Sequence, residues 1–180
     1  KEELKQIVAQ RHAEENDWSK THQELSKKEQ EWFNGKLPEI DWKSIQVKDG
    51  DPTRNASGAI LGVLGAQVDN MVCSSADLCN SDKTEGFLKQ TREIKAGDFE
   101  GKFFQAGVSE MTMSCCMIGM MLHGGVTAAM GTFFVFSDYM KPAIRMAALM
   151  EIPVKFIWTH DAFRVGEDGP THEPVEQEAQ

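Results

Sequence analysis

The 180-residue sequence lacks an apolar run long enough to cross a bilayer, because glycine, serine and threonine interrupt even its methionine-rich stretch near residue 115. It also lacks an excess of positive charge, since Lys and Arg total 19 against 28 Asp and Glu, a formal net charge of −9. This balance argues against nucleic acid or an anionic membrane as the main partner. We therefore expect no membrane span and no nucleic acid, and a partner that is a small molecule or a protein.

The sequence has few cysteines and no cysteine pattern typical of a zinc site. The four, Cys73, Cys79, Cys115 and Cys116, show neither CxxC spacing nor paired histidines. We expect them to be buried thiols, which fits a reducing compartment. The charged first residues do not resemble a signal peptide, so we expect a cytoplasmic chain.

The length of 180 residues is enough for one domain with a core of its own. The sequence begins at Lys1 rather than at a methionine, and it stops at Gln180 inside an expected helix. We therefore expect a piece of a longer protein.

Residues 1–50 are polar, with 9 Lys and Arg against 11 Asp and Glu. Their spaced apolar residues predict amphipathic helices. Three of the four tryptophans, Trp18, Trp32 and Trp42, lie here, and such rings usually cover a surface. We interpret the segment as a helical arm that packs on a neighbour. The alternative is a partly ordered linker.

The rest of the chain alternates short apolar runs with helical patterns. A helix is expected from Thr53, a second from about Ser109 to Leu122, and a third from Thr132 that Pro142 breaks or restarts and that ends near Met150. The four expected strands are residues 71–74, 102–106, 126–130 and 154–158. This alternation predicts an α/β fold with a doubly wound parallel sheet and flanking helices, joined by right-handed crossovers.

The stretch 154–174 is expected to carry chemistry, because polar side chains follow a strand that reads as buried. His160 and His172 enclose a loop that holds four charged residues and two glycines: Asp161, Arg164, Glu167, Asp168, Gly166 and Gly169. Ligands of open α/β folds bind beyond the carboxyl ends of strands. The alternative is that Thr171 merely caps a helix and the acids are solvated.

Two charged residues stand at expected helix starts. Glu110 begins a helix so apolar that we expect it to be buried on every side. Burial would raise the pKa of Glu110 and make it a proton donor, whereas an exposed Glu110 would only complement the helix dipole. Arg54 opposes the dipole of its helix, which suggests a bound anion. The alternative is a plain surface arginine.

Four segments carry a resemblance to a known family: SSADL at 74–78, GVSE at 107–110, GTFFVFSDY at 131–139 and THDAFRVGEDGPTHEPVEQ at 159–177. Together they resemble the pyrimidine-binding middle domain of transketolase, over about residues 50–180. The resemblance implies a thiamine-diphosphate-binding fold. Residues 1–50 would be a helical linker or arm from a missing diphosphate-binding domain, and residues 51–180 a pyrimidine-binding domain that is incomplete at its C-terminus.

For the cofactor, thiamine diphosphate, the resemblance implies one catalytic residue and an aromatic pocket. Glu110 matches the glutamate that shares a proton with the aminopyrimidine ring. Phe133 and Phe136 match aromatic residues of the pyrimidine pocket, with Tyr139 close behind, and three-residue spacing would stack them on one face of a helix. Mg²⁺ or Ca²⁺ would be bound by a domain not present in this chain, so no metal ligand is expected here.

For the substrate, the resemblance assigns His160, Asp168 and His172 to the hydroxyls and carbonyl of a ketose donor, and Arg54 and Ser81 to its phosphate. The parent enzyme would transfer a two-carbon ketol unit from a ketose phosphate to an aldose phosphate. Its partners would be sugar phosphates and the diphosphate-binding domain of a second subunit in a homodimer. The fragment is expected to be inactive alone.

The sequence departs from the family pattern beside its key acid. The family commonly has Arg-Glu-His where this chain has Ser109, Glu110 and Met111, so polar neighbours of the glutamate are absent. Arg164 stands where a small residue is frequent. Two alternatives therefore remain: a non-catalytic partner domain, and another thiamine-diphosphate transferase of the deoxyxylulose-phosphate synthase type.

Overall fold

The computed structural model describes residues 1–161, 166 and 168–180, and these form two compact units, 1–36 and 37–180. The first unit consists of α1 (Glu2–Thr21) and α2 (Gln23–Phe33). The predicted helices of the N-terminal segment are thus confirmed. None of the residues of α1 is buried, and ion pairs three residues apart, such as Lys5 with Glu2 at 2.9 Å, line its surface.

The second unit is built on a four-stranded parallel sheet with the order β2-β1-β3-β4. The strands are β1 (Met71–Ser75), β2 (Phe103–Gln105), β3 (Thr127–Phe133) and β4 (Lys155–Thr159). The chain runs from β1 to β2 on one side and then returns to place β3 on the other side of β1. The predicted parallel α/β fold is confirmed.

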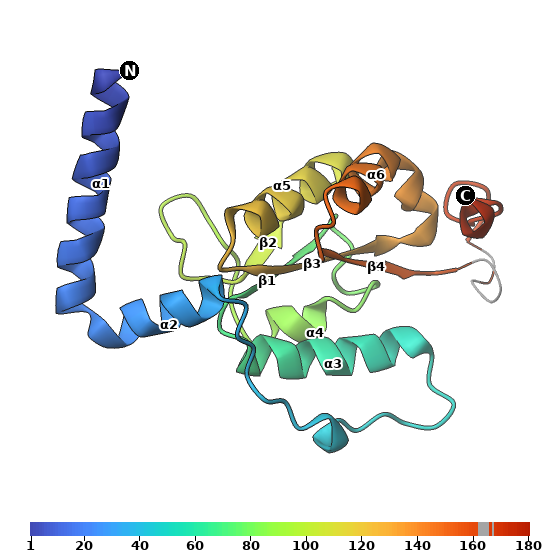
Figure 1. Ribbon diagram of the computed structural model, residues 1–180. Helices are drawn as coiled ribbons and strands as arrows, with labels where there is room; N and C mark the ends of the chain where they lie inside the picture. The colour runs from blue at the N-terminus through green and yellow to red at the C-terminus, as the bar shows by residue number, and fades with distance from the viewer. Residues whose placement is uncertain (162–165, 167) are drawn as a thin grey trace. The chain divides into compact units, whose positions relative to one another are not determined.

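Helices cover both faces of this sheet, as a doubly wound fold requires (Figure 1). On one face lie α5 (Glu110–His123) and α6 (Lys141–Leu149), and on the other lie α3 (Thr53–Gln67) and α4 (Glu85–Leu88). Short 3-10 helices complete the unit: η1 (Trp42–Ser44), η2 (Phe134–Tyr139) and η3 (Gln177–Ala179). None of the described helices is long and apolar enough to cross a membrane.

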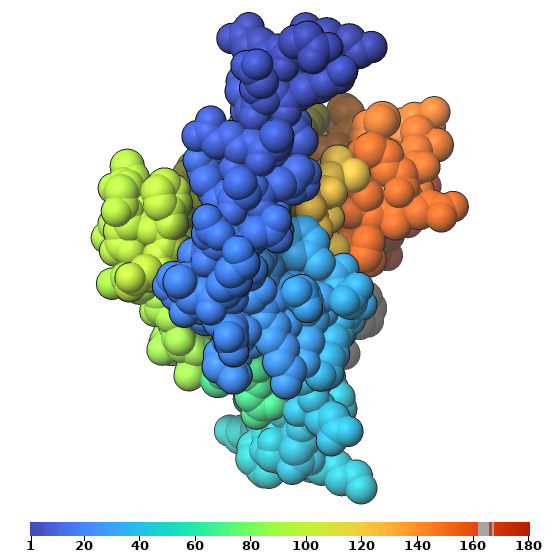
Figure 2. Space-filling view, turned by 60° about the vertical axis from the view of Figure 1, so that its left-hand side comes forward, coloured from blue at the N-terminus to red at the C-terminus, as the bar shows by residue number. Residues whose placement is uncertain are grey.

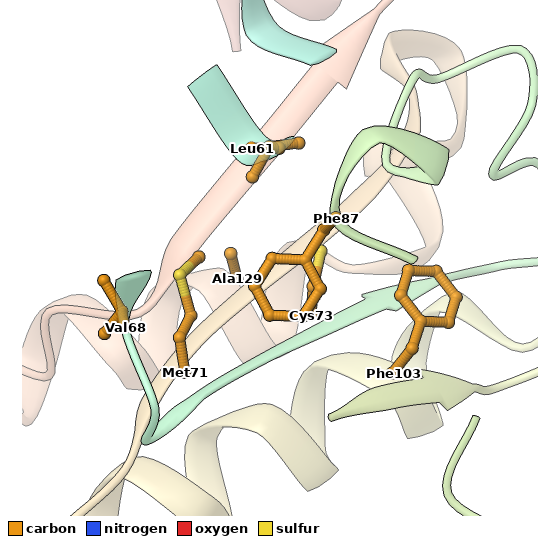
Figure 3. Packing of buried hydrophobic residues seen from close by; sticks show 7 residues of the cluster. All are labelled: Leu61, Val68, Met71, Cys73, Phe87, Phe103 and Ala129. Atoms are coloured by element: carbon orange, nitrogen blue, oxygen red, sulfur yellow. The ribbon is translucent and has the colours of Figure 1, made fainter. Parts of the chain in front are cut away.

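The core under α3 and α4 is a compact apolar cluster (Figure 3). Its members come from both helices and from the strands beneath them: Leu61, Val68, Met71, Cys73, Phe87, Phe103 and Ala129. Phe87 and Phe103 are fully buried. Close approach of α3 and α4 depends on glycine, since a side-chain carbon on Gly86 would overlap the carbonyl of Gly58.

The opposite face is covered by α5 and α6, which lie side by side, as their gold and orange surfaces show in Figure 2. Met113 and Met117 of α5 are fully buried against Met130 of β3 and Met140. Flexible methionines fill such irregular gaps well. These methionines therefore act in packing.

The structure corrects three expectations about burial. Within the described chain α5 is not buried on every side, because Leu122 is 59% exposed and Met111 36% exposed. Only Cys73 of the four cysteines is buried, while Cys115 is exposed. The strand β4 is an edge strand of this sheet and is only partly buried. The exposed side of α5, with Cys115, and the edge strand β4 lie at the surface of the described fold. Apolar composition alone does not predict burial there.

Two element boundaries also differ from expectation. The third strand continues to Phe133, because Gly131, Thr132 and Phe133 remain in register with β4. The helix expected from Thr132 is therefore a strand end followed by the 3-10 helix η2. The connection 82–101 between β1 and β2 contains α4 with the buried Phe87. Its later part, drawn yellow-green, projects from the surface in Figure 2.

We predict that Gly86→Ala destabilises this chain by about 1–3 kcal/mol, the usual cost of overpacking, because the added methyl group meets backbone atoms of Gly58 that cannot turn away. Gly119→Ala on α5 is the matched control, since its methyl group would meet nothing within 4 Å. Urea unfolding of both variants measures the difference. Equal free energies of unfolding would contradict the packing described for α3 and α4.

Candidate functional site

A cavity of about 500 Å³ opens beyond the carboxyl ends of the strands. It lies where the chain order reverses between β1 and β3, the position at which open α/β sheets bind ligands. Residues that follow three different strands line it, together with residues near the start of α5: Ala76, Asp77, Leu78, Val108, Glu110, Phe136, Tyr139 and His172.

One wall of the cavity is aromatic, and the backbone after β3 explains why. The 3-10 helix η2 has three residues per turn, so residues three apart line up along one side. Phe133 stacks on Phe136 with ring centroids 6.0 Å apart, and Phe136 stacks on Tyr139 at 6.2 Å. Phe136 and Tyr139 reach the cavity, while the buried Phe133 supports them.

Glu110 is placed in the cavity by the turn that opens α5. Gly107 adopts a φ of 67°, a conformation that favours glycine, and the Ser109 hydroxyl donates a hydrogen bond to the Ala106 carbonyl at 2.8 Å. Ser109 occupies the N-cap position of a helix whose first residue is Glu110, and its side chain makes no capping bond to that helix. Glu110 is only 7% exposed. A shielded carboxyl group thus lines the same cavity as the aromatic rings.

Arg54 and His160 meet although 106 residues separate them. The Nη1 atom of Arg54 lies 2.8 Å from Nε2 of His160, at the end of β4. The Arg54 Nε is buried and has no hydrogen-bond partner among the described residues. Arg54 therefore reaches from α3 to the strand ends, and it keeps one donor for a further acceptor.

The contact with Arg54 fixes the protonation of His160. Because arginine can only donate, Nε2 of His160 must accept, and the proton sits on Nδ1, 2.8 Å from the Thr159 hydroxyl. Burial lowers the pKa of His160, and the Arg54 charge lowers it further, against the opposing effect of Asp168. The His160 ring also lies tilted against Phe133, with ring centroids 3.7 Å apart, and His160 has a φ of 56°.

His172 lies between the aromatic wall of the cavity and the Arg54–His160 pair. Its ring meets Phe136 edge-on at 5.4 Å and Phe133 at 6.2 Å, and it lines the cavity. Asp168 is exposed, and its negative charge opposes the lowering of the His160 pKa. Ser81 is exposed in the loop after β1. Arg164 and Glu167, also considered from the sequence, lie outside the described residues.

Four cavity residues, Ala76, Asp77, Leu78 and Val108, were not singled out from the sequence. Asp77 and Leu78 line the cavity, and Asp77 has a φ of 64°, which a side-chain-bearing residue rarely adopts. Their position after a predicted strand, inside the SSADL segment, was the available signal. Among the described residues no three His, Cys, Asp or Glu side chains could hold a metal ion together.

Comparison with known proteins agrees with this geometry. Residues 51–180 match the family described as "Transketolase, pyrimidine binding domain". The chain belongs to the transketolase family. The sequence is 44% identical to a transketolase of Bacillus subtilis, over 89% of this chain and 24% of that protein. It is 41% identical to the transketolase of Halalkalibacterium halodurans, over 98% of this chain and 27% of that protein.

Solved structures of transketolases share the fold of this chain. The transketolase of Leishmania mexicana superposes with a TM-score of 0.81 and 31% identity, over 91% of this chain and 25% of that one. A Pichia stipitis transketolase in complex with sedoheptulose 7-phosphate reaches 0.79, with 33% identity and the same coverage. The chain thus spans about a quarter of the length of the transketolases it matches.

We predict that Arg54→Ala raises the pKa of His160 toward its ordinary value, because the substitution opens the site to water and removes the neighbouring positive charge. In the unaltered chain the folded state binds fewer protons than the unfolded chain just below pH 6.5, so stability falls as the pH drops through that value. Arg54→Ala should therefore lose less folding stability over this pH range.

Titration of the His160 ring signals by NMR measures the change. Arg92→Ala is the control, because Arg92 pairs with Asp98 and Glu100 on the projecting segment, away from His160. A His160 pKa that stays in place, or falls, in Arg54→Ala would contradict the lowering effect assigned to Arg54.

Proposed function

We propose that this chain supplies the pyrimidine-binding half of a transketolase active site. The complete protein would transfer a two-carbon ketol unit from a ketose phosphate to an aldose phosphate, with thiamine diphosphate as cofactor. One observation supports this most: the cavity where β1 and β3 diverge combines stacked aromatic rings with the shielded carboxyl group of Glu110.

The cavity suits the pyrimidine end of the cofactor. Its walls offer the faces of Phe136 and Tyr139 to a flat heteroaromatic ring, and Glu110 offers a carboxyl group to a ring nitrogen. When bound, thiamine diphosphate supplies the chemistry that cleaves and forms the carbon–carbon bond. The protein's share is to hold and orient the ring and to keep a proton at Glu110.

The diphosphate end needs a different surface. The described residues include no acidic or histidine cluster that could hold Mg²⁺ or Ca²⁺. We therefore assign the diphosphate and its metal to the diphosphate-binding domain of a second subunit in a homodimer. The chain alone is then inactive, and residues 1–50 would be the helical arm that leaves the diphosphate-binding domain.

Substrate recognition falls to the residues between the cavity and Arg54. His160 and His172 can donate or accept hydrogen bonds to sugar hydroxyls, and Asp168 can accept them. Arg54 and Ser81 would bind the substrate phosphate, which suits a guanidinium whose Nε has no partner among the described residues. The proposed substrates are therefore sugar phosphates, as in the cytoplasmic pentose phosphate pathway.

Neither alternative is favoured by a specific observation. The relatives compared above are transketolases rather than deoxyxylulose-phosphate synthases. A non-catalytic domain would have no chemical reason to keep Glu110 shielded in an aromatic cavity. Ser109, which replaces a charged residue of the family pattern, occupies the N-cap position of α5 and leaves Glu110 in the cavity wall.

We predict that Glu110→Gln in the full-length protein lowers turnover far more than it weakens substrate binding, because the lost proton is needed to activate the cofactor. Exchange of the C2 proton of bound thiamine diphosphate, followed by NMR, tests the step directly. The exchange should slow by about 10²-fold or more, the usual contribution of an acid–base group.

Glu100→Gln on the exposed projecting segment is the matched control, and its exchange rate should equal that of the unaltered protein. Glu110→Gln exchanging at the unaltered rate would sink the assignment of Glu110 as the residue that activates the cofactor.

A second prediction concerns the phosphate. Arg54→Ala should raise the KM for phosphorylated donors by the loss of a charge-assisted hydrogen bond, about 1.5–3 kcal/mol or roughly 10- to 100-fold. Unphosphorylated donors should be nearly unaffected. Steady-state kinetics with both kinds of donor provides the comparison. Equal losses on both would mean that Arg54 acts through His160 and not through the phosphate.

A further inference from the structure

The loop from Ala76 to Thr84 connects β1 to α4. It contributes residues to the cavity wall and also holds Ser81, the proposed phosphate ligand. Ala76, Asp77 and Leu78 form one wall of the cavity, and Ser81 lies three residues further on. The residue after Ser81, Asp82, lines neither region and is 0% exposed. A fully buried acid beside the site needs a physical explanation, because removing a carboxylate from water is costly.

Asp82 accepts three hydrogen bonds, all from neutral donors. Its Oδ2 accepts from the Ser75 hydroxyl at 2.6 Å. Its Oδ1 accepts from the Thr84 amide at 2.9 Å and from the Thr84 hydroxyl at 2.7 Å. Ser75 and Thr84 are also fully buried. These three contacts give both carboxyl oxygens of the buried acid a hydrogen-bond partner.

These bonds reach the cavity wall through Ser75. The Ser75 hydroxyl donates a hydrogen bond to Asp82, and its oxygen accepts one from the Leu78 amide at 3.1 Å. The Leu78 carbonyl in turn accepts from the amides of Ser81 and Asp82, both at 2.8 Å. Leu78 is thus held from both sides, and Asp77 is fixed between Ser75 and Leu78.

The neighbouring strand leaves room for the carboxylate. Gly131 of β3 pairs with Ser75 of β1, and a side-chain carbon on Gly131 would lie 2.9 Å from Oδ2 of Asp82 and 2.5 Å from a methyl carbon of Thr84. No larger residue fits there without displacing the loop. The glycine that opens the GTFFVFSDY segment is therefore explained by Thr84 and Asp82, on the neighbouring loop.

Burial is the largest effect on the acid and raises the pKa of Asp82, against the hydrogen bonds from Ser75 and Thr84 and the charge of Lys83. The thiols of Cys73 and Cys79 face the same carboxylate, and burial raises the pKa of each. An amide in place of the carboxylate would therefore cost less to bury.

We propose that Asp82 is a positioning residue of this site: through Ser75 and Leu78 its carboxylate holds the cavity wall for the cofactor ring and Ser81 for the phosphate in one fixed arrangement. The proposal rests on the proposed function, because the wall must meet a cofactor ring for its position to matter. It assigns a role to a residue that contacts neither cofactor nor substrate.

The test uses Asp82→Asn in the full-length protein. An asparagine keeps an oxygen for the two Thr84 donors, but its NH₂ group cannot accept from the Ser75 hydroxyl. The buried Ser75 hydroxyl therefore loses the acceptor that fixes its orientation toward Leu78. The dissociation constant for thiamine diphosphate with Mg²⁺ should rise about tenfold, the effect of one lost buried hydrogen bond. The urea midpoint of the apoprotein should stay equal or rise.

The pH profile separates positioning from general structure. Cofactor affinity of the unaltered protein should fall as the pH drops through the raised pKa of Asp82, because a protonated carboxyl no longer accepts from Ser75 at Oδ2. Asp82→Asn should lack this acid-side loss. Asp98→Asn, on the exposed projecting segment, is the control and should keep the unaltered affinity and profile.

Asp82→Ala completes the series and should bind more weakly than Asp82→Asn, since it leaves the Ser75 and Thr84 donors without any acceptor. If Asp82→Ala does not fold, Asp82→Asn decides alone. An Asp82→Asn protein with unaltered affinity and an unaltered acid limb overturns the proposal while the proposed function stands. An unaltered protein that binds no thiamine diphosphate overturns both.

Discussion

The site depends on one constraint, the parallel register that ends neighbouring strands at the same edge of the sheet. Ser75 of β1 pairs with Gly131 of β3, and Phe133 of β3 pairs with Thr159 of β4. The segments that follow these strands therefore lie close together, however far apart they are in the sequence. A slip of one residue would turn each side chain to the other face and separate the groups. The buried cores on both faces of the sheet hold that register.

Much of the fold and part of the site follow from local sequence signals. Short apolar runs between helical patterns predicted the four parallel strands, and polar residues after them predicted an edge where ligands bind. Glu110, at the start of an apolar helix, was expected to be buried, and it is. Arg54 was expected to bind an anion because it opposes its helix dipole, but the partner that the structure describes is the His160 ring. Such signals are informative because a residue that conflicts with its own segment must be stabilised by contacts with another part of the fold.

The rest could not be predicted because it depends on contacts between distant segments. The sequence shows no sign that Gly131 makes room for Asp82, since the two belong to different elements and the fit appears only when β3 lies beside β1. Composition also predicted burial of Cys115 and of all of α5, yet one side of that helix is exposed. An apolar composition indicates that a surface needs to be covered, but it does not indicate which part of a protein covers it.

The central claim is that this chain holds the ring end of thiamine diphosphate while another domain holds the diphosphate and its metal. Calorimetric titration of thiamine diphosphate with Mg²⁺ tests it directly, first with the isolated chain and then with the full-length protein. The account predicts no measurable binding by the isolated chain at micromolar concentrations, because aromatic stacking and one carboxyl group provide little of the binding free energy, and stoichiometric binding by the full-length protein. Stoichiometric binding by the isolated chain would contradict the account and place a complete cofactor site within residues 1–180.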